Sequence, residues 1–259
     1  MSDFRNYQTR AVPAGHADAA IDQGLRAYMI KVYNLMGLGL LITGLAAIGT
    51  VMLATTTDPA SAVATLPNGE MLTSFGYAIF ASPLRWVVML APLAAVFFLS
   101  FRVQSMSVSA AQTTFWVYAA LVGLSLSSIF LVYTTASISQ TFFATAAAFG
   151  ALSLYGYTTK RDLSPVGSFL IMGVFGLIIA MLVNIFLQSS ALAFAISAIG
   201  VLVFAGLTAY DTQRIKEMYF EGDGALVAGR KAIMGALALY LDFINMFLFM
   251  LRLFGGQRN

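Results

Sequence analysis

One carboxylate lies in the middle of a long apolar run near the C-terminus. Asp242 stands within Ala236-Leu-Ala-Leu-Tyr-Leu-Asp-Phe-Ile-Asn-Met-Phe-Leu-Phe-Met250, where nearly all of its neighbours are hydrophobic. At the centre of a bilayer an ionised aspartate costs about 2.5–3.5 kcal/mol on insertion scales, so such residues usually face the protein interior and mark a path for protons or ions. Asp242 is therefore the first candidate functional residue.

A second carboxylate, Asp211, lies late in the preceding apolar run, in Leu207-Thr-Ala-Tyr-Asp-Thr-Gln-Arg-Ile-Lys216. If both runs are helices, they are consecutive and antiparallel, so the two carboxyl groups meet provided that the first helix lies deep enough. In a poorly solvated core two adjacent carboxyl groups do not both ionise at low cost, so the pair would share a proton and titrate as a unit. That is the chemistry of a pH sensor.

Simpler structural roles for the same residues remain open. Asp211 is three residues before Arg214, which is the spacing of a salt bridge on one helix face. Asp242 is three residues before Asn245, and a hydrogen bond with that amide or with a backbone group would serve only helix packing.

Two aspartates on adjacent helices are also what an intramembrane aspartyl protease needs. Such enzymes have the second aspartate in a Gly-x-Gly-Asp context, whereas Asp242 follows Leu239-Tyr-Leu, and the chain has no Pro-Ala-Leu segment. The chain has no cysteine and a single histidine, His16, which excludes a thiolate nucleophile, a serine-type triad and a Cys- or His-ligated metal. We therefore expect no enzymatic activity and no cofactor.

The composition is that of a membrane protein. Hydrophobic residues make up 59% of the chain and charged residues 10%, whereas a soluble domain carries about 25% charge. No charged residue occurs between Val103 and Thr159 or between Leu163 and Tyr210. Each gap holds about two helical spans, because one span needs about 20 residues.

The apolar runs predict seven transmembrane helices. The runs are continuously apolar and do not alternate with period two, which argues against a transmembrane barrel and favours an all-α polytopic membrane protein. The predicted helices are 31–54, 86–102, 112–134, 141–158, 166–187, 191–214 and 232–253.

The runs also divide the chain into three parts. Residues 1–29 form a polar N-terminal tail, residues 30–254 the seven-helix transmembrane domain, and residues 255–259 a short C-terminal tail. Apolar residues from Ile21 to Tyr28 recur at helical spacing, so the tail contains either a short helix on the membrane surface or a solvated leader. The tail lacks a signal-peptide pattern, and we expect it to remain uncleaved.

The distribution of positive charge predicts the orientation. Seven spans place 11 of the 14 Lys and Arg residues on the side of the N-terminus, which should therefore be cytoplasmic. The C-terminus is expected outside unless the last helix re-enters. The net charge of +3 is then a topology signal, so the expected partner is the lipid bilayer and not nucleic acid.

The last-helix motif and the segment around Asp211 resemble the transmembrane Bax inhibitor motif family, in its bacterial type. The segments that carry this resemblance are 236–248, 251–255, 209–211 and 213–216. The resemblance implies a seven-helix fold with the last helix central, located in the bacterial inner membrane. It also implies a pH-sensitive calcium leak channel in which Asp211 and Asp242 form the paired aspartates.

Bacterial members of that family use an arginine at the cytoplasmic end of the second helix as a latch on the first aspartate. Arg102, in Phe97-Phe-Leu-Ser-Phe-Arg102, matches that place. The predicted topology agrees, since Arg102 closes the second span and Asp211 closes the sixth on the same side. Two features of this chain do not clearly match the family's pattern. They are the long outer loop from Thr55 to Arg85 and the lack of an acidic residue in the second span.

Calcium would be the permeant or weakly bound ion. Calcium prefers six to eight oxygen ligands, and Asp211 and Asp242 with Asn245, backbone carbonyls and water make only a weak, hydrated site, so passage is expected and not storage. The resemblance also allows a non-transporting modulator of a membrane protease or of cell-death and stress machinery, acting through a membrane protein partner. A proton-coupled transporter has little support, because no inverted halves are visible.

Overall fold

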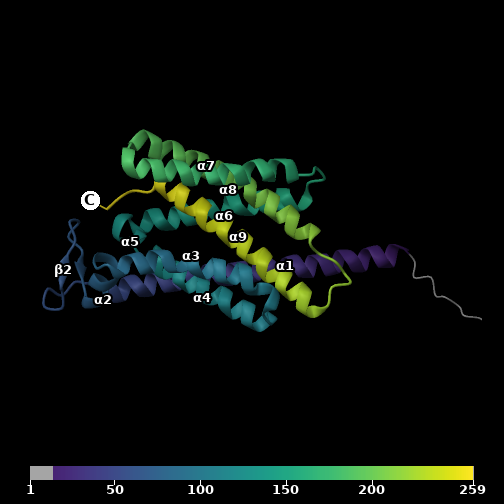
Figure 1. Cartoon of the computed structure of the whole chain (residues 1–259), viewed down its shortest axis with the longest axis horizontal. Helices are drawn as coiled ribbons and strands as arrows, with labels where there is room; N and C mark the ends of the chain where they lie inside the picture. Colours follow the sequence, from purple (N-terminus) through teal and green to yellow (C-terminus); the bar gives the residue numbers. More distant parts are fainter. Residues whose placement is uncertain (1–13, 259) are drawn as a thin grey trace, which may run out of the picture.

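The computed structural model describes residues 14–258 and the side chains of residues 23–258. Seven helices are long and apolar enough to cross a membrane, as predicted, and the chain is an all-α polytopic membrane protein (Figure 1). They are α1 (Ala14–Ala54), α3 (Leu84–Arg102), α4 (Val108–Leu126), α6 (Thr135–Thr158), α7 (Ser164–Leu187), α8 (Ser190–Glu217) and α9 (Ala225–Phe254).

Short elements connect these helices. A turn of helix, α5 (Ile129–Val132), follows α4, and a 3₁₀ turn, η2 (Val103–Ser105), follows α3. The loop after α1 holds the helical turns α2 (Ser74–Gly76) and η1 (Tyr77–Ala81), and the strands β1 (Thr55–Thr56), β2 (Ala64–Thr65) and β3 (Met71–Leu72). These strands form a small antiparallel sheet in the order β1-β3-β2.

Polar caps extend the helices beyond their apolar runs. α4 and α6 begin four and six residues before the predicted starts, because a hydroxyl satisfies a free backbone N–H there. The Ser107 hydroxyl accepts from the backbone N–H of Ala110 (3.2 Å), that of Thr134 accepts from Ser137 N (3.2 Å), and that of Ser189, before α8, accepts from Leu192 N (3.3 Å).

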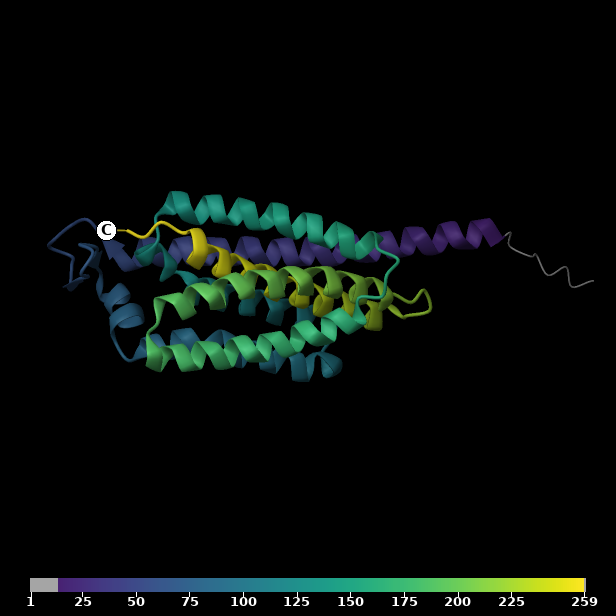
Figure 2. The ribbon, with the colours of Figure 1, turned by 90° about the horizontal axis from the view of Figure 1, so that it is seen from above.

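The N-terminal part of α1 extends past the rest of the bundle (Figures 1 and 2). The predicted tail helix is continuous with the first span, since no proline interrupts residues 14–54. Residues 1–13 of the predicted tail lie outside the described residues.

Two groups of helices are joined by α9. One group contains α1, α3 and α4, the other contains α6, α7 and α8, and α9 packs against members of both. Figure 1 shows α9 crossing diagonally between them. In α9, 61% of the most apolar stretch is buried in the bundle, against 33% or less in each of the other six spans. α9 is therefore the central helix.

The last helix spans the bundle without a break. α9 is 30 residues long, or about 45 Å, and ends at the end of the bundle opposite the start of α1 (Figure 1). The structure therefore has no re-entrant last segment within α9, and the described parts of the two tails lie at opposite ends.

The outer loop and the C-terminal tail close the end of the bundle that carries the C-terminus. Arg258 forms an ion pair with Glu70 of the loop (2.8 Å), and its backbone N–H donates to the carbonyl of Val132 (2.8 Å). Asn68 donates from its amide to the carbonyl of Leu131 (2.8 Å). The long loop is thus fastened to the connection between α4 and α6.

Close packing of α6 on α8 depends on Gly156. A Cβ at Gly156 would lie 2.9 Å from the carbonyl carbon of Ala209 on α8, and closer still to its oxygen. We expect Gly156→Ala to push these helices apart and to lower the free energy of unfolding by about 1–3 kcal/mol, seen as a lower melting temperature in detergent.

Gly150 supplies the matched control on the same helix. A Cβ at Gly150 would meet no heavy atom within 4 Å, so Gly150→Ala should leave the melting temperature unchanged or slightly higher. Equal losses for the two variants would contradict the role given to Gly156.

Candidate functional site

The carboxyl group of Asp242 is buried near the middle of α9. The residue is 4% exposed, and its Oδ2 has no hydrogen-bond partner among the described residues. A buried carboxyl oxygen without a donor is costly when ionised, because nothing replaces the water that it loses. The group therefore needs either a proton or a neighbouring group that shares one.

Asp211 supplies that neighbour from α8. It lies about two turns before the end of that helix, is partly buried, and its carboxyl group is within hydrogen-bonding range of the carboxyl group of Asp242. Two carboxyl groups in such contact can be joined by one shared proton. The structure thus brings together the two aspartates that the sequence singled out, and their function remains a prediction.

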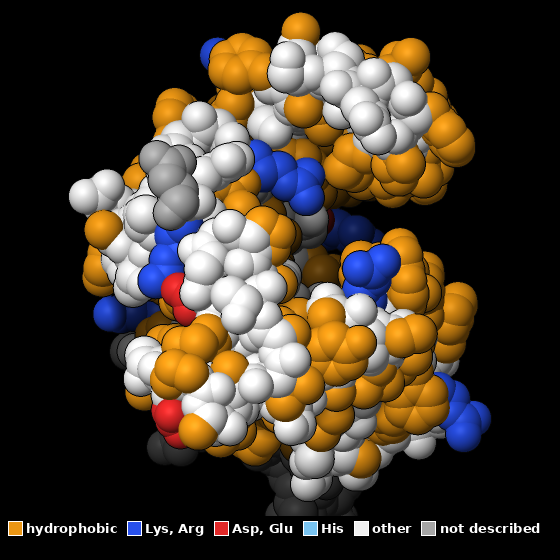
Figure 3. Space-filling view, turned by 90° about the vertical axis from the view of Figure 1, so that its left-hand side faces the viewer, with side chains coloured by type: hydrophobic (Ala, Val, Ile, Leu, Met, Phe, Trp, Pro, Cys, Tyr) orange, Lys and Arg blue, Asp and Glu red, His pale blue; other side chains and the backbone are white. Residues whose placement is uncertain are grey.

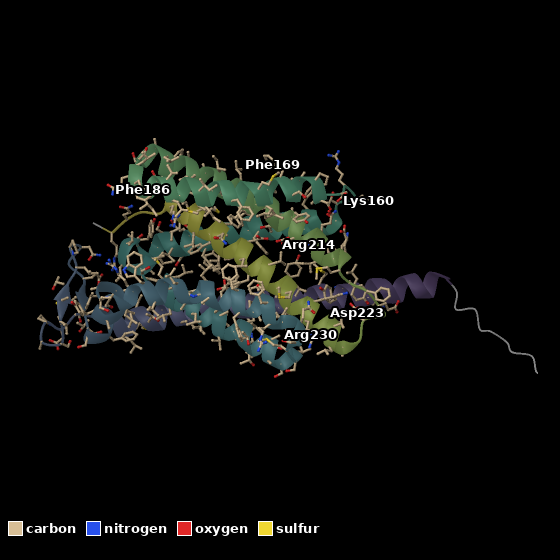
Figure 4. All side chains as sticks on the ribbon, viewed as in Figure 1. Lys160, Phe169, Phe186, Arg214, Asp223 and Arg230 are labelled. Atoms are coloured by element: carbon tan, nitrogen blue, oxygen red, sulfur yellow. The ribbon has the colours of Figure 1, made fainter. Side chains whose placement is uncertain are left out.

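Two further residues, Arg214 and Asn245, are the polar partners that the sequence suggests for Asp211 and Asp242 respectively. Arg214 is exposed on α8 (Figure 4), and the described residues include no ion pair between it and Asp211. The amide of Asn245 donates to the carbonyl of Leu241 in its own helix (2.8 Å). Among the described residues, Asn245 therefore makes no direct hydrogen bond to Asp242.

Arg102 is exposed at the last residue of α3. In the part of the chain that the structure describes, it forms no ion pair with Asp211. α3 packs mainly on α4 and η1, which keeps it on the outside of the bundle. The predicted latch contact between Arg102 and Asp211 is not made in this conformation. It remains a prediction about a different conformation of the protein.

Polar contacts just after Asp211 fix α8 against α6 and the loop that follows it. The Thr212 hydroxyl donates to Ser153 (3.3 Å), and the Gln213 side chain donates to the carbonyl of Arg161 (2.8 Å) and accepts from Leu163 N (2.8 Å). This clamp holds the Asp211 segment in position. Hydrophobicity alone does not predict these contacts, although a glutamine at the end of an apolar helix indicates a hydrogen-bonded amide.

The opposite side of α9 is fixed by a buried hydroxyl pair. Tyr240 is fully buried, and its hydroxyl lies 2.6 Å from that of Thr43 on α1, which also bonds to the carbonyl of Ala119 on α4 (2.9 Å). Phe115 and Tyr118 pack edge-on against the Tyr240 ring at 5.7 and 5.6 Å. Because a buried tyrosine hydroxyl needs a hydrogen-bond partner, a tyrosine in the middle of the last apolar run already indicates such a contact in the sequence.

The site offers few ligands for a metal ion. Among the described residues no group of three or more His, Cys, Asp or Glu side chains is placed to hold one. Asp211 and Asp242 alone provide far fewer than the six to eight oxygens that calcium prefers. Any cation at the pair would keep most of its water.

Comparison with known proteins decides the family. The family model described as "Inhibitor of apoptosis-promoting Bax1" matches residues 25–259. The chain belongs to this Bax inhibitor family. The resemblance inferred from the last-helix motif is therefore confirmed.

Bacterial relatives match over nearly the full length. The inner membrane protein YbhL of Escherichia coli is 46% identical over 237 residues, which cover 91% of this chain and 94% of the relative. An uncharacterized protein of Rickettsia prowazekii is 46% identical, with 97% and 98% covered, and one of Caulobacter vibrioides is 45% identical, with both chains fully covered.

Proposed function

We propose that the protein is a pH-sensitive leak channel for calcium, or for cations of that kind, in a bacterial inner membrane. The observation that supports this function is the contact of two carboxyl groups, from Asp211 and Asp242, inside a membrane-spanning bundle. The family, and the relative YbhL, an inner membrane protein of Escherichia coli, support this location. The excess of Lys and Arg on the side of the N-terminus supports a cytoplasmic location for that end.

The carboxyl pair would control both charge and structure. When at least one group is ionised, the pair attracts cations into the bundle. When both are protonated, that attraction is lost, and the ion pairs that either group forms are lost with it. Because two carboxylates and water bind calcium weakly, an attracted ion can leave again, as a leak requires.

The gate in this proposal is an ion pair between Arg102 and Asp211. In the closed conformation α3 moves toward α8 and the two side chains meet, and protonation of the aspartate pair releases them. The peripheral position of α3 and the proline inside it, Pro92, support such a movement.

Calcium flux into liposomes tests the pair. The purified chain should pass calcium at a rate that changes across about pH 6–8, whereas Asp211→Asn and Asp242→Asn, which cannot ionise at the changed position, should each lose that response. The amide keeps the size of the carboxyl group, so the melting temperature should confirm that both variants fold. An unchanged pH response in both variants would exclude the pair as the sensor, and no flux at any pH would exclude the channel.

The latch has a separate test in the same assay. Arg102→Gln removes the positive charge, so flux at neutral pH should rise above that of the unchanged protein, and its pH response should shrink. Lys160→Gln is the control, because Lys160 is an exposed basic residue near the same end of the bundle to which the proposal gives no role (Figure 4). Equal effects of the two variants would show that surface charge, and not a latch, governs the flux.

A further inference from the structure

A cavity of about 570 Å³ lies between α7, α8 and α9, near the end of the bundle that carries the C-terminus. It is distinct from the aspartate pair, which belongs to the other half of α8. The residues that characterise it are Met181, Asn184, Ile185, Ser190, Phe194 and Arg252. Its wall is thus apolar along two helices and polar at one edge.

The polar edge suits an anion. Arg252 is exposed in the last turn of α9, and among the described residues its guanidinium has no ion-pair or hydrogen-bond partner, packing only over the ring of Phe249 (5.7 Å). Arg258, at the same end, is by contrast paired with Glu70. No acidic side chain lines the cavity in the described part of the chain. A guanidinium presents a planar set of donors that matches a phosphate group.

Neutral donors lie beside Arg252. The Oδ1 atom of Asn184 accepts from Ser189 N (3.0 Å), which leaves its amide nitrogen without a bond in the described part of the chain. Ser190 is the first residue of α8, so the positive end of that helix dipole borders the cavity. The Asn184 amide and the start of α8 therefore favour a negatively charged ligand, as the guanidinium of Arg252 does.

The remaining wall suits acyl chains. α7 is the span with the smallest buried share, 6%, and Phe186, which follows the cavity-lining Ile185 in the chain, is 87% exposed (Figure 4). Ile185 and Phe194, which line the cavity, are also exposed to the surroundings of the bundle. Figure 3, which views this end of the molecule, shows a cleft below the upper lobe with Lys or Arg side chains at its edges. A free anion would gain nothing from such an apolar wall, whereas a lipid would.

We propose that this cavity binds an anionic phospholipid, with the phosphate on Arg252 and the acyl chains along α7 and α8. A zwitterionic lipid fits less well, because its ammonium group would find no carboxylate in the cavity. The inference does not depend on the proposed channel function.

Lipid binding to the purified chain in a neutral detergent tests this proposal. Native mass spectrometry should show phosphatidylglycerol retained more tightly than phosphatidylcholine, and Arg252→Gln should weaken phosphatidylglycerol binding by about tenfold. Arg85→Gln is the matched control, because Arg85 is exposed at the same end and also packs over an aromatic ring, that of Trp86 (5.2 Å). It should change binding little.

A second variant distinguishes the contribution of the cavity to lipid binding from that of the positive charge of Arg252. Ala193 is exposed and lines the cavity, so Ala193→Trp should fill it while Arg252 remains, and should also weaken binding. Inorganic phosphate should neither stabilise the protein against heating nor displace the lipid. The proposal would be overturned if Arg252→Gln and Arg85→Gln weakened lipid binding equally, or if Ala193→Trp left binding unchanged. It would also be overturned if both lipids bound with equal affinity, or if inorganic phosphate alone stabilised the protein and displaced the lipid.

Discussion

Two carboxyl groups in contact inside an apolar bundle are the constraint on which the rest of the structure depends. Asp242 is 4% exposed and, among the described residues, one of its oxygens has no hydrogen-bond donor, so the neighbouring carboxyl group of Asp211 is the group that can share a proton with it. The contact requires α8 and α9 to keep a fixed register. The clamp that begins at Thr212 and Gln213 holds α8 to α6, and the hydroxyl pair of Tyr240 and Thr43 holds α9 to α1.

The position of α9 between two groups of helices connects this contact to the whole bundle. The face that carries Tyr240 packs on α1 and α4, while Asp242 meets α8 in the other group. A change in charge at the aspartate pair therefore acts at the boundary between the groups. α3, which carries Arg102, lies outside this boundary and packs mainly on α4 and η1, and the proposed latch therefore requires it to move relative to α8.

The sequence was sufficient for the features that depend on hydrophobicity and chain order. Apolar length predicted the seven spans, and the antiparallel order of the last two made contact between Asp211 and Asp242 a reasonable expectation. α4 and α6 begin before their predicted starts, because the capping hydroxyls of Ser107 and Thr134 are polar and lie outside the apolar runs. The Thr43–Tyr240 pair joins residues 197 positions apart, and only packing reveals which hydroxyls meet. Whether Arg102 reaches Asp211 depends on the conformation of α3, which no local pattern encodes.

An infrared titration of the carboxyl bands of Asp211 and Asp242 shows whether the two aspartates titrate as a pair. The carboxyl titration of the unchanged protein should be compared with that of the Asp211→Asn and Asp242→Asn variants. The account predicts that replacing either aspartate shifts the midpoint of the one that remains, because each group then loses the neighbour with which it shared a proton. Midpoints that stay where they are in both variants would show two independent acids and would contradict the account.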